Sequence, residues 1–453
     1  MSMSFADSNG PFIEALINRR ADARTALRKQ SAQILADGGR LLRLLPVNFV
    51  FDVDEAVELA RAALALIDIQ TKIVRHLVER HGRSGFLDIF DVPESMRRFV
   101  NWDELQNPRH LIGRIDILAG RDRYYFCELN IDSCVAGAEI FDFCDAYFRE
   151  IGLDIRRSAG AAAPLADLAA QLARWAAELG AVRIVILDWS VGGGSPGKGY
   201  LSFDRMKDYL ARQTRSIPIY VTDERSFDPA WLAPHEAART LVHRGFMMSE
   251  MDDDGAFLDR LLGAGAHVIG TYETDIRMDK AWFALMHDSD IQVALNPSER
   301  ALISRYVPYT RALAPVDLAE VVAQKNDYIF KKRDSFGGGG ICIGAETTAA
   351  ELRALLAEEG CRAWIAQKFM ALDPICFPGD ENFEPEPHNM VFGLYIYGDR
   401  TNGILVRASA CSKIVNVTIG NAALAWAVCV DEARKAKMTS RLIEERVSCR
   451  SEA

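Results

Sequence analysis

The sequence predicts an α/β fold of the α+β kind, in which helices accompany mixed and partly antiparallel sheets. Short runs rich in β-branched and aromatic residues alternate with helical segments along much of the chain. Several of these runs follow one another with only a turn between them, which favours antiparallel pairing. A chain of 453 residues also exceeds what one hydrophobic core usually organises, so we expect two or three packed units.

Composition and charge narrow the class of protein. Hydrophobic residues make up 49% of the chain and charged residues 26%, which is typical of a folded enzyme or a large binding protein. The net charge of −10 argues against a broad nucleic-acid surface, because phosphate contacts need clustered Lys and Arg. The sequence shows no signal peptide and no apolar run of about 18 residues, and its nine cysteines lack a metal-binding spacing. We therefore expect a cytoplasmic protein with reduced thiols and neither a nucleic-acid nor a membrane partner.

The first two regions differ in their periodicity. Residues 1–110 are predicted to be helical, with Asp54 as the cap of a long helix. The buried face of that helix carries apolar residues at spacings of three and four, namely Leu66, Ile69, Ile73 and Leu77. Residues 111–175 change to strands, because LIGRIDIL and RYYFCELNI flank the turn AGRD and predict a hairpin. The segment RRSAGAAAP then predicts a linker.

The remaining regions alternate helices and strands. Residues 176–280 are predicted to form an αβα unit around the strands VRIVIL, IPIYV and AHVIG. Residues 281–430 begin with helix and then give the strand YIFKKRD, a run of four glycines and a capping box of Thr348 and Glu351. Three further strands follow there, WIAQKFM, MVFGLYIYG and GILVRASA, and residues 431–453 are predicted as a helical tail.

Two glycine-rich loops are candidates for binding phosphate. In VGGGSPGKGY, Gly192, Gly197 and Lys198 fit the P-loop motif G-x-x-x-x-G-K-[ST], but Gly199 stands where the motif needs a hydroxyl to ligate magnesium. We therefore do not interpret this loop as a P-loop. In YIFKKRDSFGGGGICIG, a strand delivers Lys331 and leads into the glycines Gly337, Gly338, Gly339 and Gly340. Four glycines let backbone amides approach an anion closely, whereas a plain hairpin, which is the alternative, needs only one or two.

The predicted hairpin of residues 111–131 carries a candidate metal site. Glu128 and Asn130 point to the same face, because side chains alternate along a strand. Asp116 and Arg114 on the partner strand can face them if the register permits. Carboxylate and amide oxygens are the ligands that magnesium prefers alongside phosphate oxygens. The alternative is a solvated sheet face with incidental charges.

Taken together, these motifs resemble the circularly permuted ATP-grasp ligases. The sets R-x-D, E-x-N and K-x-x-D-x-x-G-G-x-G occur in the order of that family, which is the reverse of the order in ordinary ATP-grasp proteins. The segments SERALISRYVPYTRAL, WIAQKFM and GILVRASACSKIVN are also similar to family segments. The resemblance is to glutathionylspermidine synthetase and its type-2 relatives, and more distantly to eukaryotic glutathione synthetase. It covers roughly residues 111–430 and implies a permuted ATP-grasp fold with an inserted αβα substrate-binding unit.

The resemblance implies roles for individual residues. The magnesium ligands are Asp116, Glu128 and Asn130, and the catalytic cations are Arg114 and Arg407. The nucleotide-binding residues are Lys331, the glycines Gly337 to Gly340, Gln367 at the adenine pocket, and Lys368. The substrate-facing residues are Lys198, Arg311 and Asn416. Lys332 departs from the proline that is common after the flap lysine, and a second phosphate-binding lysine is not obvious, with Lys368 and Arg311 as imperfect candidates.

The implied function is that of an ATP- and Mg²⁺-dependent carboxylate–amine ligase. ATP would phosphorylate a small-molecule carboxylate, and an amine from an amino acid, peptide or polyamine would then attack the acyl phosphate. Such chemistry needs positioning and electrostatics more than a protein nucleophile, and no Ser/His/Asp or Cys/His constellation is apparent in the sequence. The alternatives are a phosphotransferase that uses the same nucleotide site and a catalytically silent nucleotide-binding scaffold.

Overall fold

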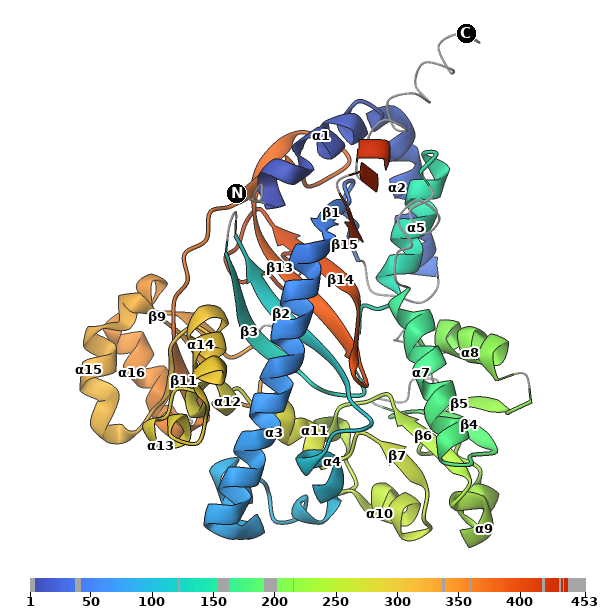
Figure 1. The fold of residues 1–453 in the computed structure, drawn as a ribbon, viewed down its shortest axis with the longest axis vertical. Coiled ribbons are helices and arrows are strands. Elements are labelled where there is room, and N and C mark those ends of the chain that lie inside the picture. The colour runs from blue at the N-terminus through green and yellow to red at the C-terminus, as the bar shows by residue number, and fades with distance from the viewer. Residues whose placement is uncertain are drawn as a thin grey trace.

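The computed structural model describes residues 5–36, 42–120, 123–134, 136–153, 163–190, 202–214, 216–335, 339–358, 360–417, 420–431, 433–434 and 436–438. Over these residues the chain folds into three β-sheets with helices packed around them, so the predicted mixed α/β class is confirmed. In Figure 1 the largest sheet lies at the centre, a small antiparallel sheet at the lower left and a parallel sheet at the lower right.

The central sheet joins strands from both ends of the chain. Its strands are β1 (Phe49–Asp52), β2 (Ile112–Ala119), β3 (Tyr124–Asn130), β12 (Ile375–Pro378), β13 (Pro385–Tyr397), β14 (Arg400–Ser409) and β15 (Ala423–Val430). Their order is β1-β15-β14-β13-β2-β3, with β12 paired to β13, and only the pair β1 and β15 is parallel. The predicted hairpin of β2 and β3 is confirmed. Since β2 pairs with β13, two distant parts of the chain meet in the middle of this sheet.

The small antiparallel sheet carries the second glycine loop. Its strands are β8 (Thr310–Ala312), β9 (Tyr328–Lys332), β10 (Ile341–Ile343) and β11 (Trp364–Lys368), in the order β10-β9-β11-β8. Helices α15 (Leu318–Ala323) and α16 (Ala349–Glu358) pack on it through a shared apolar cluster. The predicted capping box of α16 is confirmed, because Glu351 N–H donates to Thr348 Oγ1 (3.2 Å) and Thr348 N–H donates to the Glu351 carboxylate (2.8 Å).

The parallel sheet has helices on both faces. Its strands are β4 (Arg183–Asp188), β5 (Ile219–Asp223), β6 (Thr240–Arg244) and β7 (His267–Ile269), in the order β5-β4-β6-β7. The helices around it are α7 (Pro164–Glu178), α8 (Ser202–Gln213), α9 (Pro234–Ala237) and α10 (Ala256–Gly263). Ile184 and Ile186 belong to the same apolar cluster as Phe203 of α8, whereas Val185 and Leu187 belong to the cluster around α10. This alternation agrees with the αβα layering that the sequence predicts.

Helix α3 (Val53–Ile89) crosses the central sheet in Figure 1. Its predicted buried face is confirmed, since Leu66, Ile69, Ile73 and Leu77 are buried. The prediction that Asp54 caps this helix is wrong. Asp52 is the N-cap, and its carboxylate accepts hydrogen bonds from the N–H groups of Asp54 (2.9 Å) and Glu55 (3.3 Å). Because β1 ends at Asp52 and leads directly into the helix, the last extended residue is the one that caps it.

The remaining α-helices of the described residues lie before or between these elements in the chain. They are α1 (Phe5–Ile17), α2 (Arg20–Ala36), α4 (Trp102–Gln106), α5 (Ile140–Glu150), α11 (Tyr272–Met278), α12 (Ala281–Leu285), α13 (Ser289–Gln292) and α14 (Pro297–Tyr306). None of the helices in the described ranges combines the length and the apolar character needed to cross a membrane. The predicted helical tail lies outside the described residues except for 431, 433–434 and 436–438, and the predicted linker overlaps residues 154–162, which are also outside them.

Candidate active site

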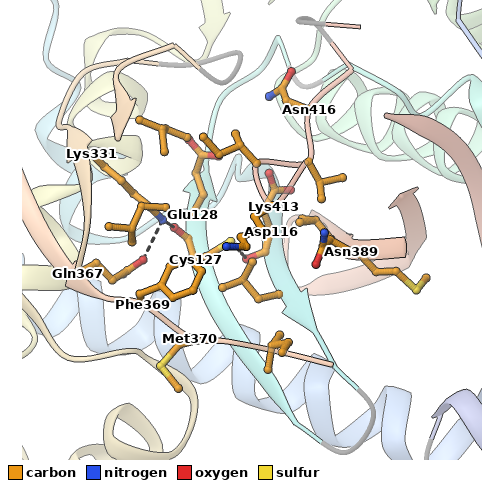
Figure 2. A pocket seen from close by; sticks show the side chains of 18 of the residues that line it. Asp116, Cys127, Glu128, Lys331, Gln367, Phe369, Met370, Asn389, Lys413 and Asn416 are labelled. Carbon is orange, nitrogen blue, oxygen red and sulfur yellow. Dashed lines mark hydrogen bonds between the residues drawn. The ribbon is translucent and has the colours of Figure 1, made fainter. Parts of the chain in front are cut away.

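A cavity of about 410 Å³ lies where the central sheet meets the small antiparallel sheet. Strands β2, β3, β13 and β14 line one side, and β9, β10 and β11 line the other. The segments 369–374 and 413–416 complete the wall. Figure 2 shows side chains from these separate parts of the chain around one space. A concave site built from two packed sheets is a usual position for a small-molecule ligand.

The predicted acidic face is present on β2 and β3. In the register of these strands Asp116 lies opposite Glu128, and Arg114 lies opposite Asn130. Opposite residues of an antiparallel pair share a face, so the register places the four side chains together, an arrangement that the sequence left open. A bulge follows Asp116, and Cys127 is the extra residue on β3.

The Asp116 carboxylate is held between two guanidinium groups. It accepts from Arg114 Nε at 2.8 Å, and Arg407 Nη2 of β14 lies 2.6 Å away. Asp116 is only 2% exposed. Burial alone would raise the pKa of this carboxyl, but the charges of Arg114 and Arg407 outweigh burial and lower its pKa to about 2. Asp116 is therefore ionised and already neutralised by protein cations.

Glu128 has a cationic partner that the sequence did not reveal. Lys280, which precedes α12, is 4% exposed, and its Nζ lies 3.0 Å from Glu128 Oε1. The same ammonium donates to the Ser335 carbonyl, next to the glycine loop. Lys280 lines the cavity. In the sequence it stands in MDKAWF between two helical segments, where no local pattern separates it from a surface lysine.

Lys331 of β9 projects into the same cavity from the other sheet. Its Nζ donates to Gln367 Oε1 (2.8 Å), as Figure 2 shows, and to the carbonyl of Cys127 (3.0 Å). The amide nitrogen of Gln367 donates to Thr310 Oγ1 (3.0 Å). Burial lowers the pKa of Lys331. The structure thus brings Lys331 and Gln367 together, with the Gln367 amide orienting the lysine.

The second glycine loop joins β9 to β10 beside these lysines. Gly337 and Gly338 lie outside the described residues, whereas Gly339 lines the cavity. Gly340 has φ +62°, and a Cβ there would lie 2.7 Å from the Cβ of Lys332. The Lys332 N–H donates to the Gly340 carbonyl (2.8 Å), which closes the hairpin. Glycine is therefore required at position 340 for both conformation and space.

Apolar side chains from both sheets line another part of the cavity. Phe369 and Met370 follow β11 and lie near Gln367 in Figure 2. Met390 and Val391 of β13 line the same space. Lys368 also lines it, with its Nζ 3.2 Å from the Asp327 carboxylate. The cavity thus has a cationic end and an apolar wall.

The predicted substrate residues are not all in this cavity. Asn416 lines it, well away from Gln367 and Phe369 in Figure 2. Arg311 of β8 is not among the described residues that line it, and its guanidinium lies 3.4 Å from Glu320 on α15. Lys198 and the whole loop 191–200 lie outside the described residues. Arg311 and Lys198 therefore gain no support as members of this site.

Few side chains near the cavity could act as protein ligands of a magnesium ion. No group of three or more His, Cys, Asp or Glu within the described residues is arranged to hold a metal ion. Asp116 is taken up by two guanidinium groups, which leaves Glu128, which lines the cavity, and Asn130, which lies on the same face of the hairpin but is not among the described residues that line the cavity. The buried Nδ2 of Asn130 has no hydrogen-bond partner in the described part of the chain. Because an amide can present either atom, this position suits a carbonyl oxygen that meets a cation.

Comparison with known proteins supports the fold. No family model and no curated protein sequence matches the chain. A solved structure from Methylobacillus flagellatus KT, provisionally named gamma-glutamylcysteine synthetase, has 11% identity and a TM-score of 0.39 and covers 83% of this chain and 95% of its own. The apo form of GSS30, a glutathione synthetase-like effector from Globodera pallida, has 12% identity and a TM-score of 0.56. That alignment covers 92% of this chain and 98% of GSS30, so the chain shares the fold of a glutathione synthetase-like protein over nearly its whole length.

Proposed function

We propose that this protein is an ATP- and Mg²⁺-dependent carboxylate–amine ligase that forms an amide bond through an acyl phosphate. The observation that carries the proposal is the convergence of three buried cations, Lys280, Lys331 and Arg407, on one cavity beside Glu128. Together with Arg114 these cations outnumber the two carboxylates that face them, Asp116 and Glu128, and a triphosphate supplies negative charges that offset the surplus. The likeness of the fold to GSS30, named for glutathione synthetase, supports this class of ligase.

We assign the nucleotide to the space between the two sheets. Lys280 and Lys331 would bind its phosphates as point charges, and the loop of Gly337 to Gly340 would cover them. The apolar wall around Phe369 suits a planar base. Gln367 contributes by holding Lys331, and Lys368 lines the same space.

We assign magnesium to Glu128 and Asn130, with phosphate oxygens as its remaining ligands. Bound there, the ion would neutralise charge that develops on the phosphates. The side chains of Asp116 and Arg114 have a different part in this proposal. Arg114 donates to both oxygens of Asp116 and to the Ala136 carbonyl, so it orients the residues around the metal site instead of meeting the substrate. Asp116 holds Arg407 at the cavity.

In the proposed reaction a carboxylate oxygen attacks the terminal phosphorus of ATP, and ADP leaves. The amine then attacks the acyl carbon, the carbon–oxygen bond to phosphate breaks, and inorganic phosphate leaves as the amine loses a proton. Arg407 would stabilise the transferring group, since its Nε has no hydrogen-bond partner among the described residues and the side chain lines the cavity. No protein nucleophile is needed. Cys127 lines the cavity, but burial raises the pKa of its thiol to about 12.

The proposed contacts to the acceptor substrate come from segments that follow β14 and β4 in the chain. Asn416 lines the cavity and is proposed to face the substrate, and Lys198 remains a proposed acceptor contact.

We also propose a division of the chain into five parts. They are a helical N-terminal region (1–110), a first ATP-grasp part (111–175), an inserted αβα substrate unit (176–280), a nucleotide-binding part (281–430) and a C-terminal tail (431–453).

A product screen tests this function. The protein is incubated with MgATP and a panel of carboxylates crossed with amines, and nucleotide and organic products are identified by mass spectrometry. We expect ADP, phosphate and an amide whose mass equals that of the two substrates less water. A stable phosphorylated product without amide would identify a phosphotransferase, and AMP with pyrophosphate would exclude the acyl phosphate. Nucleotide binding without turnover on any pair would indicate a scaffold.

A further inference from the structure

The two lysines of the cavity lie on elements that are distant in the sequence, and one buried ion pair connects these elements. Arg333 follows β9 and stands two residues after Lys331, and Asp279 directly precedes Lys280. Arg333 Nε donates to Asp279 Oδ1 (3.2 Å), and Arg333 Nη2 donates to Asp279 Oδ2 (2.9 Å). Both side chains are about 10% exposed. A bidentate, largely buried pair fixes direction as well as distance.

The backbone reinforces this connection. The N–H of Lys280 donates to the carbonyl of Arg333 (3.1 Å), and the N–H of Arg333 donates to the carbonyl of Ala363, just before β11. Lys280 Nζ also donates to the Ser335 carbonyl, two residues beyond Arg333. The strand that carries Lys331, the start of the glycine loop and the turn that carries Lys280 are therefore joined around Arg333.

We propose that the Asp279–Arg333 pair is a positioning device that sets the spacing of Lys280 and Lys331 for the phosphates of the nucleotide. This inference rests on the proposed function. A lysine is a point charge on a flexible stem, so it needs an external constraint to meet one phosphate oxygen well. Displacement by about 1 Å is enough to weaken a positioned catalytic contact strongly. Neither Asp279 nor Arg333 lines the cavity, so the pair acts through the two lysines.

The chain offers a matched control in the same guanidinium group. Arg333 Nη1 donates to Asp91 Oδ2 (2.8 Å), at the end of α3 and on a part of the chain that carries neither lysine. Asp91 has φ +50°, a conformation that asparagine tolerates well, so Asp91→Asn removes charge without backbone strain. Asp279→Asn is matched to it. Its Oδ1 can still accept the 2.7 Å hydrogen bond from the N–H of Ala281 that begins α12.

The test compares affinities for a non-hydrolysable ATP analogue and for AMP, with Mg²⁺ present, in the wild type, Asp279→Asn and Asp91→Asn. Thermal unfolding of each variant is recorded alongside. We expect Asp279→Asn to lower the ratio of ATP-analogue to AMP affinity about 10-fold, because Lys280 and Lys331 are no longer held at the spacing that suits the terminal phosphates. The affinity for AMP should stay within about twofold, and Asp91→Asn should leave the ratio unchanged.

The outcomes separate this inference from the proposed function. If the wild type binds neither nucleotide, the proposed function fails and the positioning role fails with it. If the wild type prefers the ATP analogue and Asp279→Asn keeps that preference, the proposed function stands and the positioning role is overturned. Equal losses of affinity for both nucleotides in both variants would show a purely structural ion pair. A variant that combines Arg333→Gln with Asp279→Asn should lose no more of the ratio than Arg333→Gln alone.

Discussion

Asp116 and Glu128 are opposite each other on β2 and β3, yet their carboxylates have different partners. Asp116 is neutralised by Arg114 and Arg407, whereas Glu128 forms one ion pair among the described residues, with the ammonium of Lys280. Replacing the lysine at Glu128 by a metal ion costs less free energy than displacing the two guanidinium groups from Asp116, because fewer hydrogen bonds are broken. This difference at a single pair of residues is the reason for assigning the metal to Glu128.

Glu128→Gln should lower turnover by at least about 100-fold, which corresponds to a loss of ~2.7 kcal/mol of transition-state stabilisation. The glutamine keeps the shape of the side chain but lacks the charge that a divalent cation requires. Steady-state kinetics over a range of Mg²⁺ concentrations measure the effect once a substrate pair is known. The melting temperature should fall, since the buried ammonium of Lys280 loses its carboxylate partner, so turnover is measured at a temperature where the variant remains folded. Wild-type turnover at low Mg²⁺ in this variant would contradict the assignment.

His243 of β6 offers a pH-dependent prediction at the scale of one residue. Burial, and then the charge of Arg244, lower the pKa of His243 to about 3. Between pH 6.5 and pH 3 the unfolded chain binds a proton that the folded protein does not, so folding stability falls as pH falls. From pH 6.5 to 5.5 the wild type should lose about 1 kcal/mol relative to His243→Asn.

Chemical denaturation of both proteins across this pH range measures the difference in unfolding free energy. The comparison with His243→Asn removes the contributions of the other histidines and of the carboxyl groups. Parallel pH profiles of the two proteins would contradict a buried neutral His243.

At the scale of elements, two nearby aspartates at the start of α3 have different roles. Asp52 accepts two backbone N–H groups as the N-cap, whereas Asp54 lies within the first turn. Asp52→Ala should therefore lower the free energy of unfolding by about 1 kcal/mol, and Asp54→Ala by only a few tenths. Urea denaturation of the two variants checks this. Equal losses of unfolding free energy in the two variants, or a larger loss for Asp54→Ala, would contradict the assignment of Asp52 as the N-cap.

This pair of residues also shows why the sequence predicts elements better than their ends. The periodicity of Leu66, Ile69 and Ile73 required a helix with one buried face, and the structure has it. The residue at which the helix begins depends on where β1 stops. The short strand β1 is held in place by pairing with β15, from the other end of the chain. Local pattern carries no information on such a distant partner.

In the candidate site, too, the residues set by local pattern were predicted, whereas those set by distant contacts were not. The hairpin that holds Asp116, Glu128 and Asn130 is local, so alternation and one turn were enough to predict its shared face. Lys331 was predicted because it precedes a glycine run. Lys280 was missed, because its approach to Glu128 depends on how the turn before α12 docks on the small sheet. Arg311 was assigned by resemblance alone, and its side chain lies toward α15.

At the scale of the whole molecule, the proposed site exists only because two sheets meet. The cations come from β14, from β9 and from the turn before α12, and the acidic face comes from β2 and β3. The parallel sheet is docked to this assembly by a fully buried pair, since Arg244 Nη2 donates to Asp132 Oδ2 two residues after Asn130. The geometry of the acidic face of β2 and β3 and the attachment of the αβα unit are therefore coupled through one short segment.

The most direct test of the central claim compares the two lysines that lie beside the two glycine loops. Isothermal titration with Mg²⁺ and a non-hydrolysable ATP analogue is performed on the wild type, Lys331→Met and Lys198→Ala, with melting temperatures recorded for each. The account predicts that the wild type binds, that Lys331→Met loses at least about 10-fold in affinity, and that Lys198→Ala binds as the wild type does. Binding that collapses in Lys198→Ala and survives in Lys331→Met would place the nucleotide at the other loop and contradict the account.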